Sequence, residues 1–382
     1  MKLLILTQKV DKNDDILGFF HGWVAEFAKY CEQVTVIALG VGSPCEISQS
    51  DDFSERKIIS QGNYDLPRNV KVLSLGKPAQ GWSALGREKS NNRLKTIVRF
   101  YRYIWSKRKD YDNVFVHMNP EYVVLGGVFW RIMGKKIGLW YMHKSVDFKL
   151  RLAEKLTHTI FSATKESFRL KTKKLNITGH GINVKQFLRK DRGGINSFFK
   201  IVTVGRISPI KDYDTLIDAV EILQKNNVKV HLDIIGGPGK LDQEEYLAGL
   251  IQKVKDKKLD EIINFVGAVP NSNIGTYLHQ ADLFVNSSQT GSLDKTILEA
   301  MACGLVVISS NDSSKDVFRE NKDKLFFKPK DSFDLSQKIS RIIRLPSSDR
   351  ERIGSDLRRK VEKNHDLEEL IKKIMNIYQK IQ

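Results

Sequence analysis

The sequence predicts an α/β protein made of two doubly wound, Rossmann-like domains that face each other across a cleft. Short runs rich in Val, Ile and Leu alternate with amphipathic helical patterns from one end of the 382 residues to the other. Near-continuous apolar strands separated by helices are typical of parallel sheets that are covered on both faces. The alternation is interrupted at the polar, glycine-containing stretch 190–199 and then starts again.

Each expected strand is a short run of residue types that are usually buried. In the first half these runs occupy 3–6, 34–38, 70–75, 114–118, 137–142 and 159–163. In the second half they occupy 201–204, 231–235, 262–266, 283–285, 306–309 and 325–327. We therefore expect one domain over 1–190, a second over 191–360, and an amphipathic helix within 361–382 that packs back on the domains.

Composition narrows the classes of function. An apolar fraction of 41% and a mean hydropathy of −0.33 are typical of a globular protein. Cys31, Cys45 and Cys303 are scattered, which excludes a disulfide framework and a cysteine metal site and fits a reducing cytoplasm. The apolar run at 3–6 is short and acids follow it, so we expect a first buried strand rather than a secretory signal.

The net charge of +18 is concentrated in the first half of the chain. Residues 1–190 hold 33 Lys and Arg against 17 Asp and Glu, whereas the remainder holds 30 against 28. The densest stretch, 87–109, has nine basic residues and one acid. A domain helix with a solvated basic face and attachment to an anionic membrane surface are both open interpretations. Nucleic-acid binding is not expected, because no nucleic-acid module is recognisable.

The basic stretch also carries a helical apolar pattern. The residues that recur at helical spacing are Leu94, Ile97, Val98, Tyr101, Ile104 and Trp105. Most of the basic side chains fall on other faces of the expected helix. On either interpretation, the sequence therefore predicts an amphipathic helix here.

Two stretches carry the residue types of an anion and sugar site. Gly205 and Arg206 end an apolar strand, and Lys211 follows just before a helix. Cations at the carboxyl end of a strand, with free N–H groups at a helix start, suit a diphosphate. Glu299 lies in a second helix, rich in small residues, and its carboxylate suits the hydroxyls of a ribose. The alternatives are a solvated loop and a surface pair of Glu299 with Lys295.

The order of these motifs resembles the retaining GT-B glycosyltransferases of the glycosyltransferase family four type, also called glycosyl transferases group 1. The matching pieces are Gly205-Arg206, Lys211, LIDA at 216–219, IIGGP at 234–238, INFVGAVP at 263–270, ADLFVNSS at 281–288 and EAMACG at 299–304. The resemblance covers 200–330 and, more loosely, the first domain. As an ordered set the pieces are specific, although each alone is a weak signal.

The resemblance implies which residues contact the sugar donor. A glycine loop after the first strand lets the backbone approach the diphosphate, and Gly18 is the candidate, with a plain turn glycine as the alternative. The backbone near Val269 is expected to read the nucleotide base. The full set of implied donor contacts is Gly18, Arg206, Lys211, Gly236, Val269, Gly291, Ser292, Leu293 and Glu299.

One position departs from the family pattern. The family has a Glu eight residues before the position of Glu299, near the transferred sugar, and this chain has Gly291 there. Backbone N–H groups of 290–294 and the carboxylate of Asp294 are expected to take its place. Altered or lost transfer is the alternative.

Histidines at strand ends are the remaining candidates, because the family often places histidines there to face the donor sugar. His117 and His143 each follow an expected buried strand, and His21 is a weaker third candidate. Each could equally be a structural residue. With Asp294, His117 and His143 form the predicted catalytic set.

The resulting hypothesis is retaining hexosyl transfer from a UDP- or GDP-sugar to a hydroxyl acceptor. A lipid-linked or cell-envelope acceptor is expected, with the protein in the cytoplasm or peripheral on the inner face of the cytoplasmic membrane. Neither a metal nor a cofactor is expected. A Rossmann oxidoreductase is excluded because no Gly-X-Gly-X-X-Gly turn follows the first strand. A non-catalytic protein that binds nucleotide sugars remains open.

Overall fold

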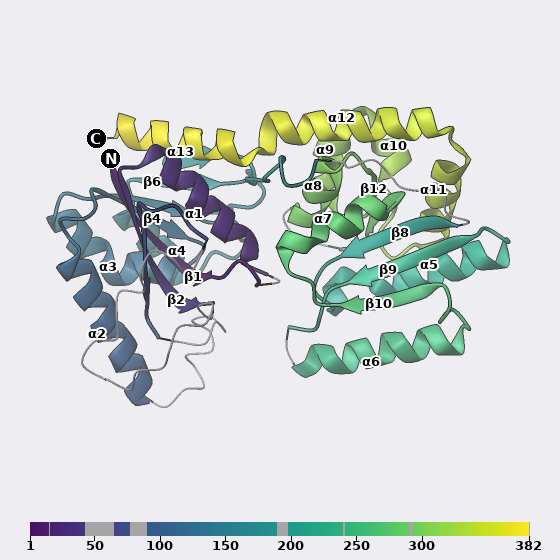
Figure 1. Ribbon diagram of the computed structural model, residues 1–382, viewed down its shortest axis with the longest axis horizontal. Coiled ribbons are helices and arrows are strands. Elements are labelled where there is room, and N and C mark those ends of the chain that lie inside the picture. The colour runs from purple at the N-terminus through teal and green to yellow at the C-terminus, as the bar shows by residue number, and fades with distance from the viewer. Residues whose placement is uncertain are drawn as a thin grey trace. The chain divides into compact units, whose positions relative to one another are not determined.

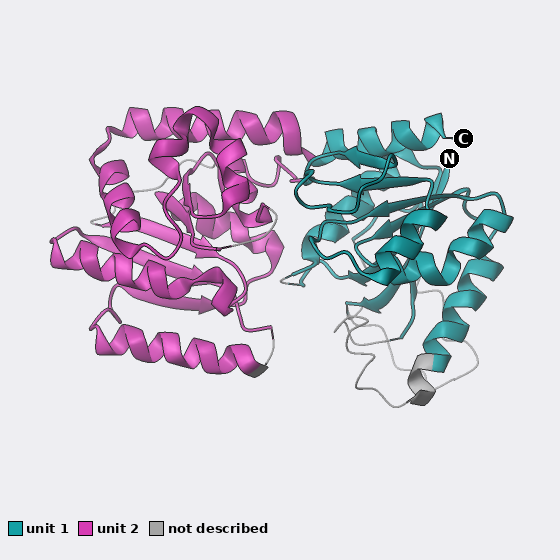
Figure 2. Ribbon diagram, turned by 180° about the vertical axis from the view of Figure 1, so that it is seen from behind, with its two compact units in different colours: residues 1–181, 367–382 teal, residues 182–366 magenta. Residues whose placement is uncertain are grey.

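The computed structural model describes residues 1–14, 16–42, 65–76, 90–188, 198–239, 241–289 and 293–381. They form two compact units, which we describe separately (Figure 2). Unit 1 comprises 1–181 and 367–382, and unit 2 comprises 182–366. The division falls between Gly181 and Ile182, whereas the sequence placed it at 190/191, a position outside the described residues.

Unit 1 is built on a parallel sheet in which the described residues form seven strands, ordered β3-β2-β1-β4-β5-β6-β7. The strands are β1 (Lys2–Val10), β2 (Gln33–Val41), β3 (Val70–Ser74), β4 (Asn113–His117), β5 (Lys136–Trp140), β6 (Thr159–Ser162) and β7 (Leu175–Ile177). The sequence predicted all of them except the short β7, which pairs only with β6 at the sheet edge.

Helices cover both faces of this sheet (Figure 1). They are α1 (Gly18–Tyr30), α2 (Ser90–Ser106), α3 (Pro120–Ile132), α4 (Phe148–Leu156) and α13 (Leu367–Lys380). In β1, Leu3 and Ile5 pack with α1 and α13, whereas Leu4 and Leu6 pack in a second cluster with α2, α3 and α4. Because side chains alternate along a strand, one apolar run supplies both clusters.

The C-terminal helix α13 completes unit 1. Its buried residues are Leu367, Leu370, Ile371, Ile374, Met375 and Tyr378. The Tyr378 hydroxyl donates a 2.7 Å hydrogen bond to the carbonyl of Val114 in β4. A Cβ at Gly138 of β5 would lie 2.4 Å from that hydroxyl, so the glycine makes room for the tyrosine.

Unit 2 holds a second parallel sheet, whose five strands within the described ranges are ordered β10-β9-β8-β11-β12. They are β8 (Phe199–Val204), β9 (Val230–Ile235), β10 (Ile263–Gly267), β11 (Leu283–Asn286) and β12 (Val306–Ser309). The α-helices are α5 (Tyr213–Lys225), α6 (Leu241–Asp256), α7 (Asn271–Gln280), α8 (Lys295–Ala302), α9 (Lys315–Phe318), α10 (Lys322–Leu325), α11 (Ser332–Arg344) and α12 (Ser347–His365). Helix α5 packs against α6 and α11, and α12 packs against α8 and β12.

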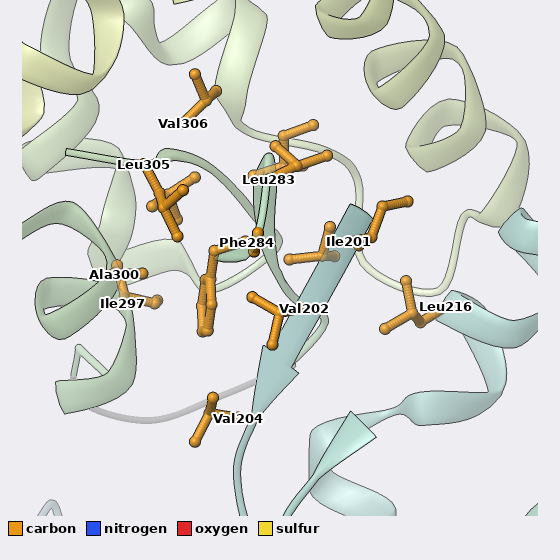
Figure 3. Close-up of a cluster of buried hydrophobic side chains, with 14 of the residues drawn as sticks. Ile201, Val202, Val204, Leu216, Leu283, Phe284, Ile297, Ala300, Leu305 and Val306 are labelled. Carbon is orange, nitrogen blue, oxygen red and sulfur yellow. The ribbon is translucent and has the colours of Figure 1, made fainter. Parts of the chain in front are cut away.

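The core of unit 2 is organised around β8 (Figure 3). Ile201 lies toward Leu216 of α5, whereas Val202 lies toward Phe284 of β11 and helix α8. In each unit, parallel strands alternate along the chain with helices, which confirms the predicted α/β class.

The prediction of a strand at 325–327 is wrong. Residues Lys322–Leu325 form the short helix α10, and only Phe326 makes an isolated bridge, to Ser309. Leu325 and Phe327 are nevertheless fully buried. Their apolar character reflects burial in the core and not pairing in the sheet.

A close backbone contact joins the ends of β8 and β9. Gly236 has φ +143°, and a Cβ there would lie 2.0 Å from the carbonyl oxygen of Gly205. Its N–H donates to the carbonyl of Gly267, 2.8 Å away, at the end of β10. Only glycine fits this position, so three neighbouring strands can end close together.

Gly236→Ala should therefore lower the free energy of unfolding of unit 2 by about 2 to 4 kcal/mol, through backbone strain and the clash with Gly205. Chemical denaturation would measure this loss. Gly249→Ala in α6 is the matched control, because nothing lies within 4 Å of a Cβ there. The control should be neutral or stabilising by up to about 1 kcal/mol. Equal stability of the two variants would contradict the assignment.

Candidate functional site

The candidate residues of unit 2 gather where the order of the strands reverses. The chain runs from β8 outward through β9 to β10, then returns to place β11 and β12 on the other side of β8. The loops after β8 and β11 therefore leave adjacent strands in an open parallel sheet. Ligands bind beyond the carboxyl ends of strands at such a switch point. Arg206 and Lys211 follow β8, and Asp294 directly precedes α8, the helix that follows β11.

Lys211 is held across the switch point by an ion pair. Its ammonium donates to Asp294 Oδ2 at 2.7 Å, and the amide of Asn286 donates to the same oxygen at 2.9 Å. Ser287 Oγ donates to the carbonyl of Lys211 at 2.7 Å. The lysine and aspartate side chains are only 19% and 21% exposed. The loop after β8 is thus fastened to the end of β11 by both backbone and side chain.

The backbone of the same loop is also fixed. The Tyr213 hydroxyl donates to the carbonyl of Gly205 at 2.8 Å, and this tyrosine is almost fully buried. Asp212 takes a left-handed conformation, with φ +52°, and accepts a hydrogen bond from Thr215. Lys211 therefore extends from a rigid turn, which lowers the entropic cost of binding an anion there.

Arg206 leaves this turn on the side of β9. A Cβ at Gly239 would lie 2.8 Å from Arg206 Cδ, so the side chain runs along the loop between β9 and α6. Gly239 in turn donates its N–H to Gln243 Oε1 at 2.8 Å. The arginine is exposed, in contrast to the paired Lys211. Two cations with different surroundings thus border one edge of the sheet.

Glu299 is a buried carboxyl, 2% exposed, so the alternative of a surface residue is wrong. Its Oε1 accepts a hydrogen bond of 3.1 Å from Asn271, the first residue of α7. Burial raises the pKa of Glu299, and the neighbouring Lys295 and Asn271 oppose that rise. Burial likewise lowers the pKa of Lys295, against the attraction of the carboxylate. Glu299 is thus a buried carboxyl whose orientation is fixed by Asn271.

The remaining residues of unit 2 that were predicted to contact the donor are Gly291, Ser292, Leu293 and Val269. Gly291 and Ser292 lie outside the described residues. Leu293 is buried in the core, so only its backbone could face a ligand. Val269 is half-buried and lies two residues before Asn271, the partner of Glu299. The expected sites for the base and the ribose are therefore linked through one short segment.

Unit 1 repeats the reversal of strand order between β1 and β4. Gly18 starts the helix after β1, and His117 ends β4. A Cβ at Gly18 would lie 3.0 Å from the carbonyl of Lys12, so the backbone that approaches this glycine is the chain's own loop. The plain structural role that the sequence left open thus has direct support at Gly18.

His117 is enclosed by aromatic rings. It is 3% exposed, stacks on Phe20 with ring centroids 4.0 Å apart, and has Trp23 at 5.9 Å. Its Nδ1 lies 3.3 Å from the hydroxyl of Thr7 in β1. These contacts fix the ring at the switch point of unit 1. They also explain its presence without a substrate, so a catalytic role stays a prediction.

His143 is exposed in the loop after β5, and its proton can be placed. Nδ1 accepts the backbone N–H of Ser145 at 3.1 Å and lies 2.8 Å from the Ser145 hydroxyl. Because Nδ1 accepts, the neutral ring carries its proton on Nε2. His143 is thus arranged to donate a hydrogen bond from Nε2. His21, the weaker candidate, is 7% exposed in α1.

Three polar residues that hold the candidate side chains were missed from the sequence. Asn286 holds Asp294, Asn271 holds Glu299, and Thr7 contacts His117. A signal existed for the first of these, because Asn286-Ser287-Ser288 is a polar run directly after the apolar strand β11. All three residues fix a candidate side chain from a neighbouring strand or helix.

Comparison with known proteins then decides the family of unit 2. Residues 184–360 match the family model of glycosyl transferases group 1. This segment belongs to the glycosyl transferases group 1 family. The matched segment contains the whole unit 2 cluster of Arg206, Lys211, Asp294 and Glu299. The family that the motifs suggested is confirmed.

A curated relative of this group 1 segment is the alpha-monoglucosyldiacylglycerol synthase of Acholeplasma laidlawii. It is 33% identical over 161 residues, which cover 38% of this chain and 39% of that synthase. The similarity therefore spans less than half of the relative's length.

Solved structures share the fold over nearly the whole chain. Anabaena HepE in complex with UDP and glucose has a TM-score of 0.73 and 16% identity, covering 99% of both chains. Sucrose-phosphate synthase from Thermosynechococcus elongatus has a TM-score of 0.75 and 14% identity, covering 100% of this chain and 99% of that one. The predicted GT-B fold, with a Rossmann-like sheet in each unit, is confirmed.

Two features are absent from the residues that the structure describes. No helix there combines the length and the apolar character needed to cross a membrane. Nor do those residues bring three or more His, Cys, Asp or Glu side chains together as a metal site.

The carboxylate of Asp14 holds the loop before Gly18 in place, and the effect of its protonation on stability can be tested. Asp14 Oδ2 accepts from the Lys9 ammonium at 2.5 Å, and Oδ1 accepts the N–H groups of Ile16 and Leu17 at 2.9 and 2.6 Å. Burial would raise the pKa of Asp14, but these hydrogen bonds and the lysine charge outweigh it and lower the pKa below 3.8. The resulting stabilisation is present above pH 3.8 and is lost as pH falls through the lower folded-state pKa.

Asp14→Asn should therefore cost about 1 to 2 kcal/mol of stability at pH 7 through loss of the ion pair, and progressively less below pH 4. Denaturation at a series of pH values would measure both effects. Asp65→Asn is the control, because its ion pair with Lys12 is 76% exposed on the aspartate side and should contribute little. A loss for Asp14→Asn that does not change with pH would contradict the ion-pair account.

Proposed function

We propose that the chain is a retaining glycosyltransferase that moves a hexosyl group from a nucleotide diphosphate sugar to a hydroxyl acceptor. The observation that carries the proposal is the cluster of Arg206, Lys211 and Glu299 at the switch point of unit 2. Membership of residues 184–360 in the group 1 family supports it. A UDP-sugar is the first donor to test, because a solved structure of similar fold holds UDP and glucose. GDP-sugars come next.

The diphosphate would bind at the turn after β8. Lys211 is paired with Asp294 in the described structure, so an incoming diphosphate competes with that carboxylate for the ammonium. Arg206 is exposed on the other side of the turn and adds a second positive charge. Backbone N–H groups that lead into α5 add further donors. The turn is rigid before the ligand arrives, as a site that must stabilise developing charge requires.

The nucleoside would lie toward α7. Glu299 offers a buried carboxyl for the ribose hydroxyls, and Asn271 fixes its orientation. The backbone around Val269 precedes Asn271 and would read the base. Gly236 keeps the ends of β8 and β9 close together beside this proposed site.

In the transfer step, the bond between the anomeric carbon and the diphosphate oxygen breaks, and the acceptor oxygen bonds to the same face of that carbon. The acceptor proton passes to the departing phosphate oxygen. Arg206 and Lys211 stabilise the negative charge that develops on the leaving group. Asp294 is proposed to contact the sugar in place of the Glu that Gly291 replaces. In unit 1, His117 and His143 are the proposed catalytic histidines, with His143 donating from Nε2.

The acceptor class is part of the same proposal. A lipid-linked sugar or a cell-envelope glycan is favoured by the basic first half of the chain and by a relative named for a glucosyldiacylglycerol product. The enzyme would act in the cytoplasm, on the inner face of the cytoplasmic membrane. The second candidate function is non-catalytic binding of a nucleotide sugar, which the glycine at 291 favours.

Single substitutions should distinguish glycosyl transfer from non-catalytic binding of a nucleotide sugar. Arg206→Ala, Lys211→Ala and Glu299→Gln should each raise the dissociation constant for UDP by about 10- to 100-fold, because each removes a charged partner of the ligand. Isothermal titration calorimetry would measure binding, and release of UDP from a panel of UDP-sugars would measure turnover. Lys225→Ala is the control, a 70% exposed cation paired with Glu221 in α5. UDP binding without turnover of any donor would favour the non-catalytic candidate.

The pair of Lys211 and Asp294 calls for a double-mutant cycle. If Asp294 acts only by positioning Lys211, the effects of Asp294→Asn and Lys211→Ala on UDP affinity should be clearly non-additive. If Asp294 also contacts the sugar, Asp294→Asn should lower kcat for the UDP-sugar beyond its effect on UDP binding. Unchanged affinity and unchanged kcat in Asp294→Asn would remove the residue from the site.

A further inference from the structure

Helix α2 has two apolar faces, and only one of them is used inside unit 1. Phe100 and Ile104 are fully buried in the cluster that α2 shares with α3 and α4. A second set of apolar side chains points away from that core. Its members Leu94, Val98, Tyr101 and Trp105 are 60%, 62%, 39% and 53% exposed. Their spacing of four, three and four residues places them along one side of the helix.

Helix α3 extends this exposed side. The Tyr101 hydroxyl donates to the carbonyl of Leu125 at 2.9 Å, and the rings of Trp105 and Phe129 are 5.3 Å apart. Further exposed apolar side chains of α3 are Val128 and Ile132, at 56% and 80%. Helical geometry puts 125, 128, 129 and 132 within an arc of about 100°, so the apolar strip continues from α2 onto α3. The α2–α3 surface consists of Leu94, Val98, Tyr101, Trp105, Val128 and Ile132.

Basic side chains dominate the charge around the α2–α3 surface, and the nearby acids Asp110 and Glu121 are paired with Lys107 and Lys149. Residues 90–109 contain no Asp or Glu, and neither do residues 122–136. Lys95, Arg102 and Lys109 are exposed on or just after α2. The guanidinium of Arg108 lies over the Trp105 ring, 4.5 Å from its centroid. A strip of apolar and aromatic side chains within a basic rim is complementary to an anionic bilayer. The apolar side chains can enter the acyl region, and the basic side chains can bind the lipid phosphates.

We propose that the α2–α3 surface is a membrane-docking surface that binds anionic phospholipid bilayers. The apolar strip enters the boundary between headgroups and acyl chains, with Trp105 at the level of the headgroups. The basic side chains bind lipid phosphates. Phe100 and Ile104 keep α2 packed in unit 1, so the helix docks as part of a folded unit and not as a detached anchor. The inference rests on this surface alone and stands or falls independently of the transfer reaction.

The full-length protein can be tested by co-sedimentation with vesicles. We expect binding to phosphatidylcholine vesicles that contain about 30% phosphatidylglycerol, and at least tenfold weaker binding to phosphatidylcholine alone. Raising NaCl from about 0.05 to 0.5 M should weaken binding severalfold, because the basic rim is screened. Failure to bind the anionic vesicles at low salt would overturn the proposal, as would equal binding to the neutral vesicles.

Two sets of variants test the surface itself. The first variant changes the apolar strip and combines Val98→Gln with Trp105→Gln. The second changes the basic rim and combines Lys95→Gln, Arg102→Gln and Lys109→Gln. Each variant should lower vesicle affinity by at least tenfold without changing the melting temperature by more than a few degrees. The matched controls are in unit 2. They are Ile251→Gln with Phe333→Gln, which are 36% and 62% exposed, and the triple change of the exposed Lys322, Lys324 and Lys328 to Gln.

The controls should bind vesicles as the unchanged protein does. Equal loss of binding in the controls would show a general charge effect and overturn the assignment to α2 and α3. Size-exclusion chromatography tests the alternative that a second copy of the chain covers this surface. If the protein forms a dimer that Val98→Gln with Trp105→Gln abolishes, and no vesicle binding is seen, the surface joins copies of the chain and the membrane proposal is wrong.

Discussion

The candidate site depends on the parallel pairing of β8 with β11. This pairing is short, with Ile201 opposite Leu283 and Val202 opposite Phe284. It nevertheless brings together two loops that are far apart in the sequence, because parallel strands end at the same edge of a sheet. Lys211 and Asp294 meet there although 83 positions separate them. Unit 1 applies the same constraint to β1 and β4, where Thr7 contacts His117.

Much of this arrangement could be predicted from the sequence because apolar runs determine parallel strands. The runs located every strand except β7, and the Gly-Arg and Lys positions after β8 followed directly. The partners of these side chains could not be predicted in the same way. Asn271 reaches Glu299 across 28 positions, and such contacts depend on how loops fold over a sheet edge, which no local pattern encodes.

The basic helix shows a different limit of sequence patterns. Six apolar residues at helical spacing predicted one amphipathic helix, but only Ile104 among them is fully buried, together with Phe100. A helix that is apolar over a wide arc has more such residues than one core contact can cover. Spacing alone does not tell which part of the arc faces inward. In the structure, part of the arc packs in the core and the rest forms an exposed strip. The exposed strip could therefore be identified as a surface only from the structure.

The return of α13 to unit 1 has a consequence for how the protein is made. Six side chains of that helix are buried in unit 1, whereas residues 182–366, which form unit 2, are translated before it. During synthesis, the apolar side chains of α1 and the sheet that face α13 stay uncovered until residues 367–380 leave the ribosome. Unit 2 can fold on the nascent chain before α13 is made, but unit 1 cannot complete its core until α13 has been synthesised. A chain that stops before α13 therefore exposes apolar surface on unit 1, which chaperones and proteases recognise.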